Sequence, residues 1–238
     1  MSTFAPAMPH GDIEEVFDEV FFVTGTMRAI FGGSTWQFSR NMTIVRDQGQ
    51  LTLINAVRLD DAGLAALDRL GKVTNVIKLG SMHGLDDAFY VDRYGAKLWA
   101  LPGLTHESGL ATDIELVPGG PMPFSGCSLF AFETSSRPEG ILRLDRAGGI
   151  LIAVDALQNW HGPDRFFDET SSKLMAQYGF FQPANIGPGW RQAANPQGSD
   201  FARVKQLSFR HVLCAHGEPL RDTAHAAFSD RFQREFGV

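Results

Sequence analysis

The sequence predicts an α/β fold, because two groups of short strands flank a segment in which strands and helices alternate. The first group of strands covers roughly residues 19–54 and the second covers 114–154. Between them, residues 60–101 show strand and helix patterns in turn. This alternation indicates a mixed α/β domain. We expect residues 1–12 to form a flexible tail and residues 13–238 to form a single domain.

The N-terminal strands are short and separated by turn residues. Gly32-Gly33 and the Asp47-Gln48-Gly49 sequence are the turn signals. Strands bounded by such residues indicate an antiparallel meander. The expected strands cover residues 19–25, 26–31, 36–39, 42–45 and 51–54.

The alternating segment begins with a helix over residues 61–70. Leu64, Leu67 and Leu70 recur at helical spacing, an aspartate of the Asp60-Asp61 pair can cap the first turn, and Gly71 can end the last one. Strand 73–79, a short helix that ends at Gly95 and strand 97–101 follow.

The second half returns to strands. We expect strands over 114–117, 128–133, 140–144 and 149–154, then an irregular, aromatic-rich stretch over 156–200 that contains one helix at 168–178. Strand 209–214 and a helix over 220–236 complete the chain. That last helix places Ala224, Ala227, Phe228 and Phe232 on one face, which is typical of a helix packed against a core.

Composition and charge argue against several classes of protein. The chain of 238 residues has a net charge of −6 and scatters its 21 Lys and Arg, whereas nucleic-acid binding needs clustered basic residues. Two cysteines are too few for a disulfide scaffold or a four-cysteine zinc site. No apolar run approaches the roughly 20 residues of a membrane span, and the N-terminus does not show a signal-peptide pattern. We therefore expect a cytoplasmic protein without a nucleic-acid or membrane partner.

The first candidate site is the loop after strand 73–79, which contains His83, Asp86 and Asp87. Imidazole nitrogen and carboxylate oxygen together suit a divalent metal. The two aspartates could equally cap the following helix, with His83 as an ordinary loop residue.

Two further candidates also lie where strands end. Asp155 directly follows the apolar run 150–154, where a carboxylate needs a partner, a metal or water. His216 follows strand 209–214, and the next residue, Gly217, allows a sharp turn. A turn residue without a site role explains Asp155 or His216 equally well, and we interpret Cys214 as a small core residue.

Signals for a nucleophile or a nucleotide site are missing from the sequence. The segments around Ser108 and Ser125 do not have the Gly-x-Ser-x-Gly spacing, and neither a P-loop nor a dinucleotide-binding glycine motif is present. His161, six residues after Asp155, could approach the same site, and His106 is a weaker candidate.

The order of these segments resembles the metallo-β-lactamase fold superfamily. In that family a strand meander and a helix–strand pair lead into a His-x-His-x-Asp-His motif. An Asp after an apolar strand and a His in a tight glycine turn come later. Here the meander ending at residue 55, the loop at 81–87, Asp155 and the 215–219 turn occur in this order. The resemblance implies a four-layer αββα sandwich of two mixed β-sheets flanked by helices.

The metal motif departs from the family pattern. Aligning His83 with the first histidine places Leu85 and Ala88 at the other two and Asp87 at the aspartate, and the region expected to hold the third histidine, 135–140, has none. The resemblance therefore implies one metal ion, held by His83, Asp87, Asp155 and His216, with Asp86 in place of Asp87 as an alternative. Zinc is the expected ion, and iron and manganese are alternatives.

The resemblance implies a metal-dependent hydrolase that uses a metal-activated water on a small-molecule substrate. Asp87 would orient the nucleophile, and His161 or His106 would protonate the leaving group. The alternative is a metal-free, non-catalytic module that binds a ligand or forms a homo-oligomer through the aromatic segment 160–190. A third hypothesis is an iron-dependent oxidoreductase. Fold alone does not decide among these functions.

Overall fold

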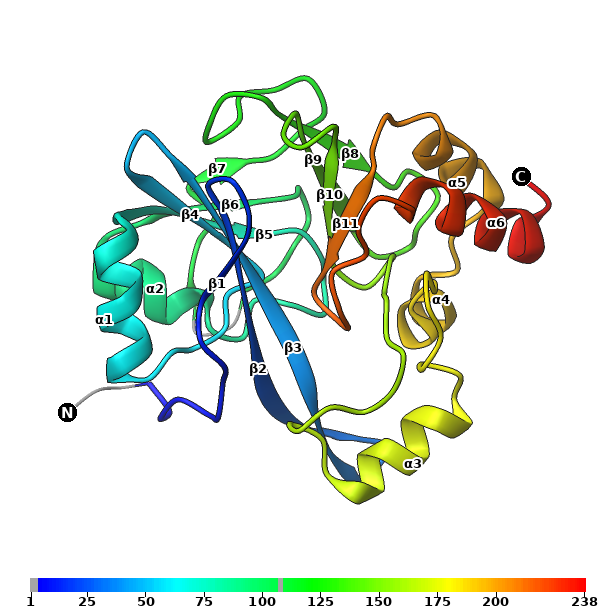
Figure 1. Ribbon diagram of the computed structural model, residues 1–238, viewed down its shortest axis with the longest axis horizontal. Coiled ribbons are helices and arrows are strands. Elements are labelled where there is room, and N and C mark those ends of the chain that lie inside the picture. The colour runs from blue at the N-terminus through cyan, green and yellow to red at the C-terminus, as the bar shows by residue number, and fades with distance from the viewer. Residues whose placement is uncertain (1–3, 107–108) are drawn as a thin grey trace.

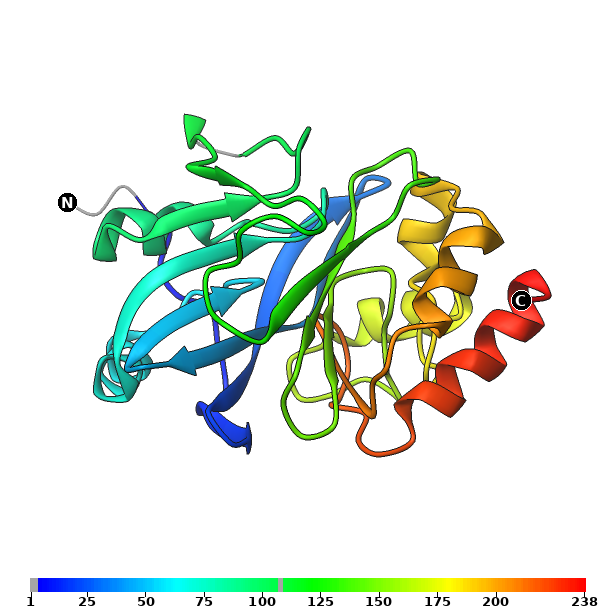
Figure 2. The ribbon, with the colours of Figure 1, turned by 90° about the horizontal axis from the view of Figure 1, so that it is seen from above.

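A computed structural model describes residues 4–106 and 109–238, and in it two β-sheets lie face to face between two layers of helices (Figures 1 and 2). Helices α1 (Asp61–Leu70) and α2 (Asp87–Tyr94) cover the outer face of the first sheet. Helices α4 (Pro188–Ala194), α5 (Gly198–Lys205) and α6 (Ala224–Phe236) lie on the side of the second. This arrangement confirms the expected four-layer αββα sandwich.

The first sheet contains the strands in sequence order, from β1 to β7, within the described residues. β1 to β4 form an antiparallel meander, as expected, whereas β4 to β7 pair in parallel. Helices α1 and α2 make the crossovers from β4 to β5 and from β5 to β6, so both helices pack on the same side. The strands are β1 (Glu14–Phe17), β2 (Val20–Phe31), β3 (Ser34–Asp47), β4 (Gln50–Ile54), β5 (Lys72–Lys78), β6 (Lys97–Ala100) and β7 (Ile114–Glu115).

Two pairs of expected strands are in fact single long strands, β2 and β3. Gly25 does not break β2: it pairs with Arg40 in register. A Cβ at this position would lie 2.5 Å from the Cγ1 atom of Val57, so the glycine allows close packing and does not form a turn.

The second sheet has the order β11-β10-β9-β8. β9 pairs in antiparallel with both of its neighbours, and β10 pairs in parallel with β11. The strands are β8 (Cys127–Ala131), β9 (Gly140–Leu144), β10 (Ile150–Ala153) and β11 (His211–Cys214).

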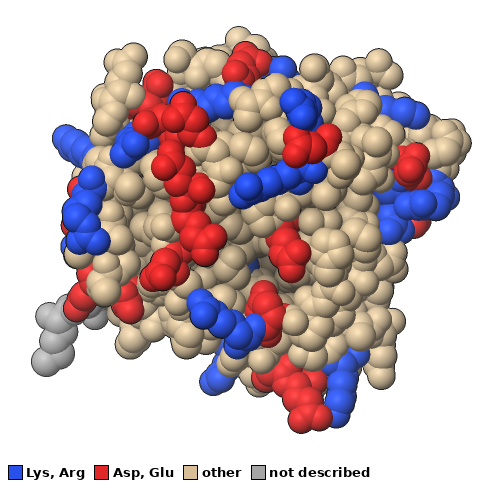
Figure 3. Space-filling view, in the orientation of Figure 1, with Lys and Arg blue, Asp and Glu red and all other residues tan. Residues whose placement is uncertain are grey.

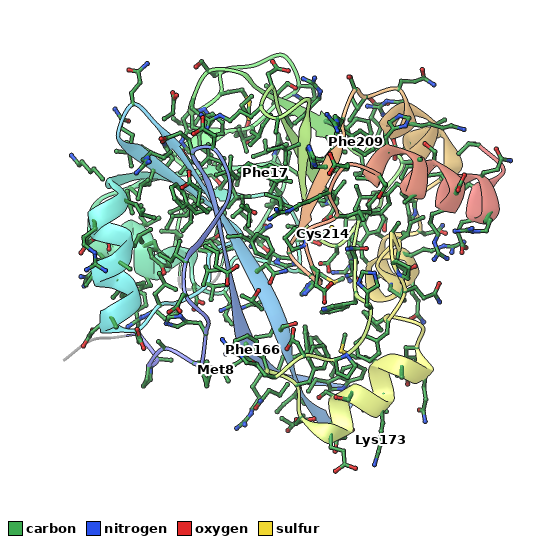
Figure 4. The ribbon with its side chains drawn as sticks, in the orientation of Figure 1. Met8, Phe17, Phe166, Lys173, Phe209 and Cys214 are labelled. Atoms are coloured by element: carbon green, nitrogen blue, oxygen red, sulfur yellow. The ribbon has the colours of Figure 1, made fainter. Side chains whose placement is uncertain are left out.

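Strand β10 shows how the layers divide the core. Ile150 and Ile152 face the apolar layer between the sheets, whereas Leu151 faces the layer under α4 to α6. This alternation follows from the two-residue period of a strand. Phe228 of α6 and Cys214 of β11 belong to the same helical layer, and Cys214 lies in the interior (Figure 4), which confirms its role as a core residue.

The predicted helix ends are confirmed where local signals are strong. The Asp60 carboxylate accepts a hydrogen bond from the Gly63 amide at 2.8 Å and caps α1. Gly95 ends α2 with a left-handed backbone conformation. Helix α3 (Glu169–Gln177) begins after Asp168, which caps it in the same way.

The expectation that residues 156–200 are irregular apart from one helix is wrong. Helices α4 and α5 form because tertiary packing buries Trp190 and Phe201 completely, which outweighs the glycines and prolines around them. Helix α6 begins at Ala224 and not at residue 220, because Leu220 exchanges backbone hydrogen bonds with Val212 of β11.

The N-terminal segment that we expected to form a tail contacts the domain where it is described. His10 pairs with Gly25 of β2, and the Phe4 ring packs on Phe89 at 5.6 Å between centroids. None of the described helices combines the length and the apolar composition that crossing a bilayer requires.

Candidate metal centre

The register of β10 and β11 places Asp155 beside His216. These strands are parallel, with Ala153 opposite Cys214, so the residue two positions beyond each strand leaves the sheet at the same edge. The Ala215 amide continues the ladder by donating to the Ala153 carbonyl at 2.9 Å. Asp155 and His216, 61 residues apart in the chain, are thereby brought into contact.

His83 comes to the same place from the first sheet. The chain after β5 pairs with the start of β9 through Gly80 and Glu139, and the Gly140 amide donates to the Leu79 carbonyl at 2.8 Å. A Cβ on Gly80 would lie 2.4 Å from the Glu139 Oε2 atom, so this crossing needs a glycine. The two sheets meet here, and the loop that carries His83 lies against the end of β10.

Both imidazoles face the Asp155 carboxylate. The His83 Nε2 atom lies 3.2 Å from Oδ2, and the His216 Nε2 atom lies 3.4 Å from Oδ1. One potential ligand atom from each of the three residues lies within 4.8 Å of the others. This cluster of His83, Asp155 and His216 is the candidate metal centre.

Backbone contacts fix the orientation of His216. Its Nδ1 atom lies 3.2 Å from the Ser39 carbonyl oxygen of β3, which can only accept a hydrogen bond, so the proton resides on Nδ1. The Asn41 side chain donates to the carbonyls of Cys214 and Gly217 and holds the turn from the same strand. These contacts present the Nε2 lone pair to the cluster.

Asn159 holds the other side of the turn. Its side chain donates to the Glu218 carbonyl at 2.9 Å, and its backbone pairs with Gly217. Gly217 has a φ of +88°, and a Cβ there would lie 2.0 Å from the Asn159 carbonyl oxygen. Only glycine fits this position, which explains the glycine that follows His216 in the sequence.

Burial sets the charges of the cluster. Burial lowers the pKa of His83, and the nearby Asp155 carboxylate opposes this shift. Burial alone would raise the pKa of Asp155, but attraction to His83 and hydrogen bonds with His216 and His83 outweigh it, and the net pKa lies well below its ordinary value. Asp155 is therefore ionised.

The donor set fits a divalent cation. Because Ser39 accepts the Nδ1 proton, Nε2 is the ring nitrogen of His216 that faces the Asp155 carboxylate, at 3.4 Å, and a cation bound between them would have both as ligands. Two imidazoles and one carboxylate are a ligand set used for zinc and for iron in proteins. The residues present therefore suit a single ion with open coordination positions.

Asp87, a predicted ligand, is not part of this cluster. Its carboxylate is buried, and neither oxygen has a hydrogen-bond partner in the described structure. A Cβ on Gly84 would lie 2.7 Å from Asp87 Oδ2 and 3.0 Å from Lys78 Nζ, so both side chains lie against this glycine. Burial raises the pKa of Asp87 to about 7, and the Lys78 charge opposes the rise. Its role as a ligand stays a prediction.

Asp86, the alternative ligand, is engaged elsewhere. Its Oδ2 atom accepts hydrogen bonds from the Arg40 guanidinium and, at 2.6 Å, from the Arg58 amide. The carboxylate thus links β3 to the segment before α1.

The two candidate acids lie outside the cluster as well. His161 is exposed, and its Nδ1 atom lies 3.1 Å from the Glu218 carboxylate. The Nε2 atom of His106 lies 2.7 Å from the Thr112 hydroxyl. Proton transfer by either residue stays a prediction.

Two residues near the centre were missed from the sequence. Glu139 is buried, and its Oε1 atom accepts a hydrogen bond from the Ala156 amide at 2.8 Å, which braces the Asp155 turn. Burial and repulsion by Asp155 hold the pKa of Glu139 well above its ordinary value. Gln158 donates to Asp155 Oδ1 at 3.2 Å. The position of Glu139 directly before the apolar strand 140–144 could have indicated that its carboxylate lies near the centre.

The cluster opens into a cavity of about 560 Å³. His83, Asp155 and His216 line it, whereas Asp87, His106 and His161 do not. Its other walls come from β2, β3, the segment that contains α3, and α4.

No family model matches the sequence, and no curated protein is significantly similar to it. Solved structures do share its fold. A metallo-β-lactamase from Pontibacter korlensis has a TM-score of 0.58 and 13% identity, covering 94% of this chain and 99% of that one.

Two other solved metallo-β-lactamases agree. FIM-1 from Pseudomonas aeruginosa, in a mono-zinc form, has a TM-score of 0.60 and 12% identity, covering 97% of each chain. DIM-1, exposed to ceftazidime, has a TM-score of 0.62 and 13% identity, covering 96% of this chain and 98% of that one. The chain therefore has the metallo-β-lactamase fold.

Proposed function

We propose that this protein is a hydrolase that uses one divalent metal ion, with zinc as the expected ion. The observation that carries the proposal is the convergence of His83, Asp155 and His216 within 4.8 Å at the wall of a cavity. The structural neighbour FIM-1 has a mono-zinc form, which supports a single zinc ion in a protein of this fold. The substrate is a small molecule, because the cavity is of the size that small ligands occupy.

The chain's own residues would hold the ion and position the reactants. The two Nε2 atoms and the Asp155 carboxylate would bind it, while Ser39 and Gln158 fix the orientation of His216 and Asp155. When bound, a zinc ion lowers the pKa of a coordinated water towards about 7 and polarises a carbonyl group. The aromatic wall formed by Phe38 and Trp160 beside His216 excludes bulk water from the reacting bond.

Metal content tests the proposal directly. Protein purified without added metal is analysed for zinc, iron and manganese per chain, before and after incubation with each ion. We expect about one ion per chain in the native protein. We expect the His216→Ala and Asp155→Ala variants to lose the ion while far-UV circular dichroism shows that the fold is retained.

His225→Ala is the matched control, because His225 lies on α6 and its Nε2 atom contacts the Lys205 carbonyl. This variant should keep its metal. Full metal content in both cluster variants would show that the centre lies elsewhere. No metal in the native protein, even after incubation, would favour the metal-free binding module, and iron with a visible absorption band would favour the oxidoreductase.

A further inference from the structure

The cavity beside the candidate metal centre has predominantly aromatic walls. Strands β2 and β3 contribute Phe31, Trp36 and Phe38 from one side, and Trp160 and Tyr178 come from the other. Side chains of the two sides contact each other at two places. The Trp36 and Tyr178 rings stack with centroids 6.0 Å apart, and the Phe38 and Trp160 rings pack edge to face with centroids 6.5 Å apart. Flat apolar faces of this kind favour a flat apolar ligand.

The mouth of the cavity is apolar as well. Six large apolar side chains are exposed in the described parts of the chain, and four of them, Phe31, Met82, Leu85 and Tyr178, line this cavity. Exposed apolar side chains are unremarkable singly, but a group around one opening marks a ligand or partner site. Tyr178 is 60% exposed, so a ligand could cover much of its ring.

The charged side chains that line the cavity limit which ligands it can bind. Among the described lining residues, the Asp, Glu, Lys, Arg and His side chains are Arg40 and the three residues of the metal centre. The Arg40 guanidinium is already bound to the Asp86 carboxylate and the Ala56 carbonyl. Acidic and basic side chains are interspersed over the face of the molecule seen in Figure 3. A carboxylate in the aromatic part of the cavity would lose water without gaining a cationic partner.

We infer that the cavity takes neutral aromatic esters or amides and discriminates against ligands that carry a carboxylate. The hydrolytic part of this inference rests on the proposed function. In that reaction the acyl C–O or C–N bond breaks and the water oxygen bonds to the acyl carbon. One water proton goes to the leaving oxygen or nitrogen, and the acid product releases the other to solvent.

Binding is tested without hydrolysis. The probes are 2-acetonaphthone, a neutral ketone without a hydrolysable bond, and 2-naphthoate, an anion of nearly the same shape. Calorimetry on protein treated with a chelator measures both dissociation constants. We expect the ketone to bind at least about tenfold more tightly, because the naphthoate carboxylate must be desolvated without a partner. Equal or tighter binding of naphthoate, or no binding of the ketone, would overturn the inference.

Variants locate the binding to this cavity. Tyr178→Ala should weaken ketone binding by roughly threefold to tenfold, since it removes an aromatic wall worth about 1 kcal/mol. Val117→Ala is the matched control, because Val117 is also an exposed apolar residue but does not line the cavity. Unchanged ketone binding in Tyr178→Ala would show that the ligand lies elsewhere.

Hydrolysis is measured separately on zinc-loaded protein with 2-naphthyl acetate and with its 6-carboxylate derivative. We expect kcat/KM to be at least about tenfold higher for the neutral ester. Ketone binding without hydrolysis of either ester would refute the hydrolase proposal and leave the neutral aromatic binding site in place. Faster hydrolysis of the carboxylate would refute the substrate class and leave the hydrolase proposal in place.

Discussion

Replacing Asp87 by Asn should change how the stability of the metal-free protein depends on pH. The Asp87 carboxylate is buried, its two oxygens have no hydrogen-bond partner in the described structure, and its pKa is raised to about 7 from 3.8, mainly by burial. The folded state therefore binds a proton at pH values where the unfolded state has lost it. Stability from this group is present below pH 3.8 and is lost as the pH rises through 7.

The size of the effect follows from the shift. A pKa difference of about 3 units corresponds to about 4 kcal/mol over the full range, and about 2.5 kcal/mol falls between pH 5 and pH 7.5. Asn has nearly the same shape and does not titrate. The difference in unfolding free energy between Asp87→Asn and the native protein should therefore move in favour of the variant by about 2.5 kcal/mol over this interval.

Urea denaturation in the presence of a chelator measures this difference at each pH. Comparing the two proteins cancels the titration of all other groups, and the constant cost of burying an amide does not change the slope. Asp92→Asn is the matched control, because Asp92 is an exposed residue of the same helix, α2. A stability difference that stays constant with pH, or that moves against Asp87→Asn as the pH rises, would refute the assignment of a raised pKa.

Three further predictions concern stability and metal affinity. Gly217→Ala should lower the unfolding free energy by more than about 2 kcal/mol, because φ is +88° and the new Cβ would lie 2.0 Å from the Asn159 carbonyl oxygen. A Cβ on Gly162 would meet open space, so Gly162→Ala should lower the unfolding free energy far less in the same urea titration. Asp200→Ala should lower the unfolding free energy by about 3 kcal/mol, since this buried carboxylate accepts hydrogen bonds from Glu133 and Thr134 in the segment that follows β8. An equal loss of stability in Asp230→Ala, at an exposed aspartate, would contradict that reasoning. Asn159→Ala should reduce zinc affinity by about tenfold to a hundredfold in a competition titration with a chelator, because the turn that carries His216 loses the hydrogen bond from the Asn159 side chain to the Glu218 carbonyl. Unchanged zinc affinity would show that this hydrogen bond is not needed to position His216.

Local signals in the sequence were sufficient where neighbours along the chain decide the structure. Asp60 and Gly71 mark the ends of α1, and Gly95 marks the end of α2, because caps act over a few residues. Helices α4 and α5 were not predicted, because burial of Trp190 and Phe201 stabilises them and burial depends on residues far away in the chain.

The sequence by itself determined the residue types at the candidate centre, the strands that precede Asp155 and His216, and the glycine that His216 needs beside it. Only the tertiary structure decided which side chains meet. The parallel register of β10 and β11 sets Asp155 against His216, and the Gly80–Glu139 crossing brings His83 to them. Asp87 lies outside this cluster, and its carboxylate and the Lys78 ammonium group both lie against Gly84. Strand order and register depend on the packing of whole sheets, and a motif of four or five residues does not encode them.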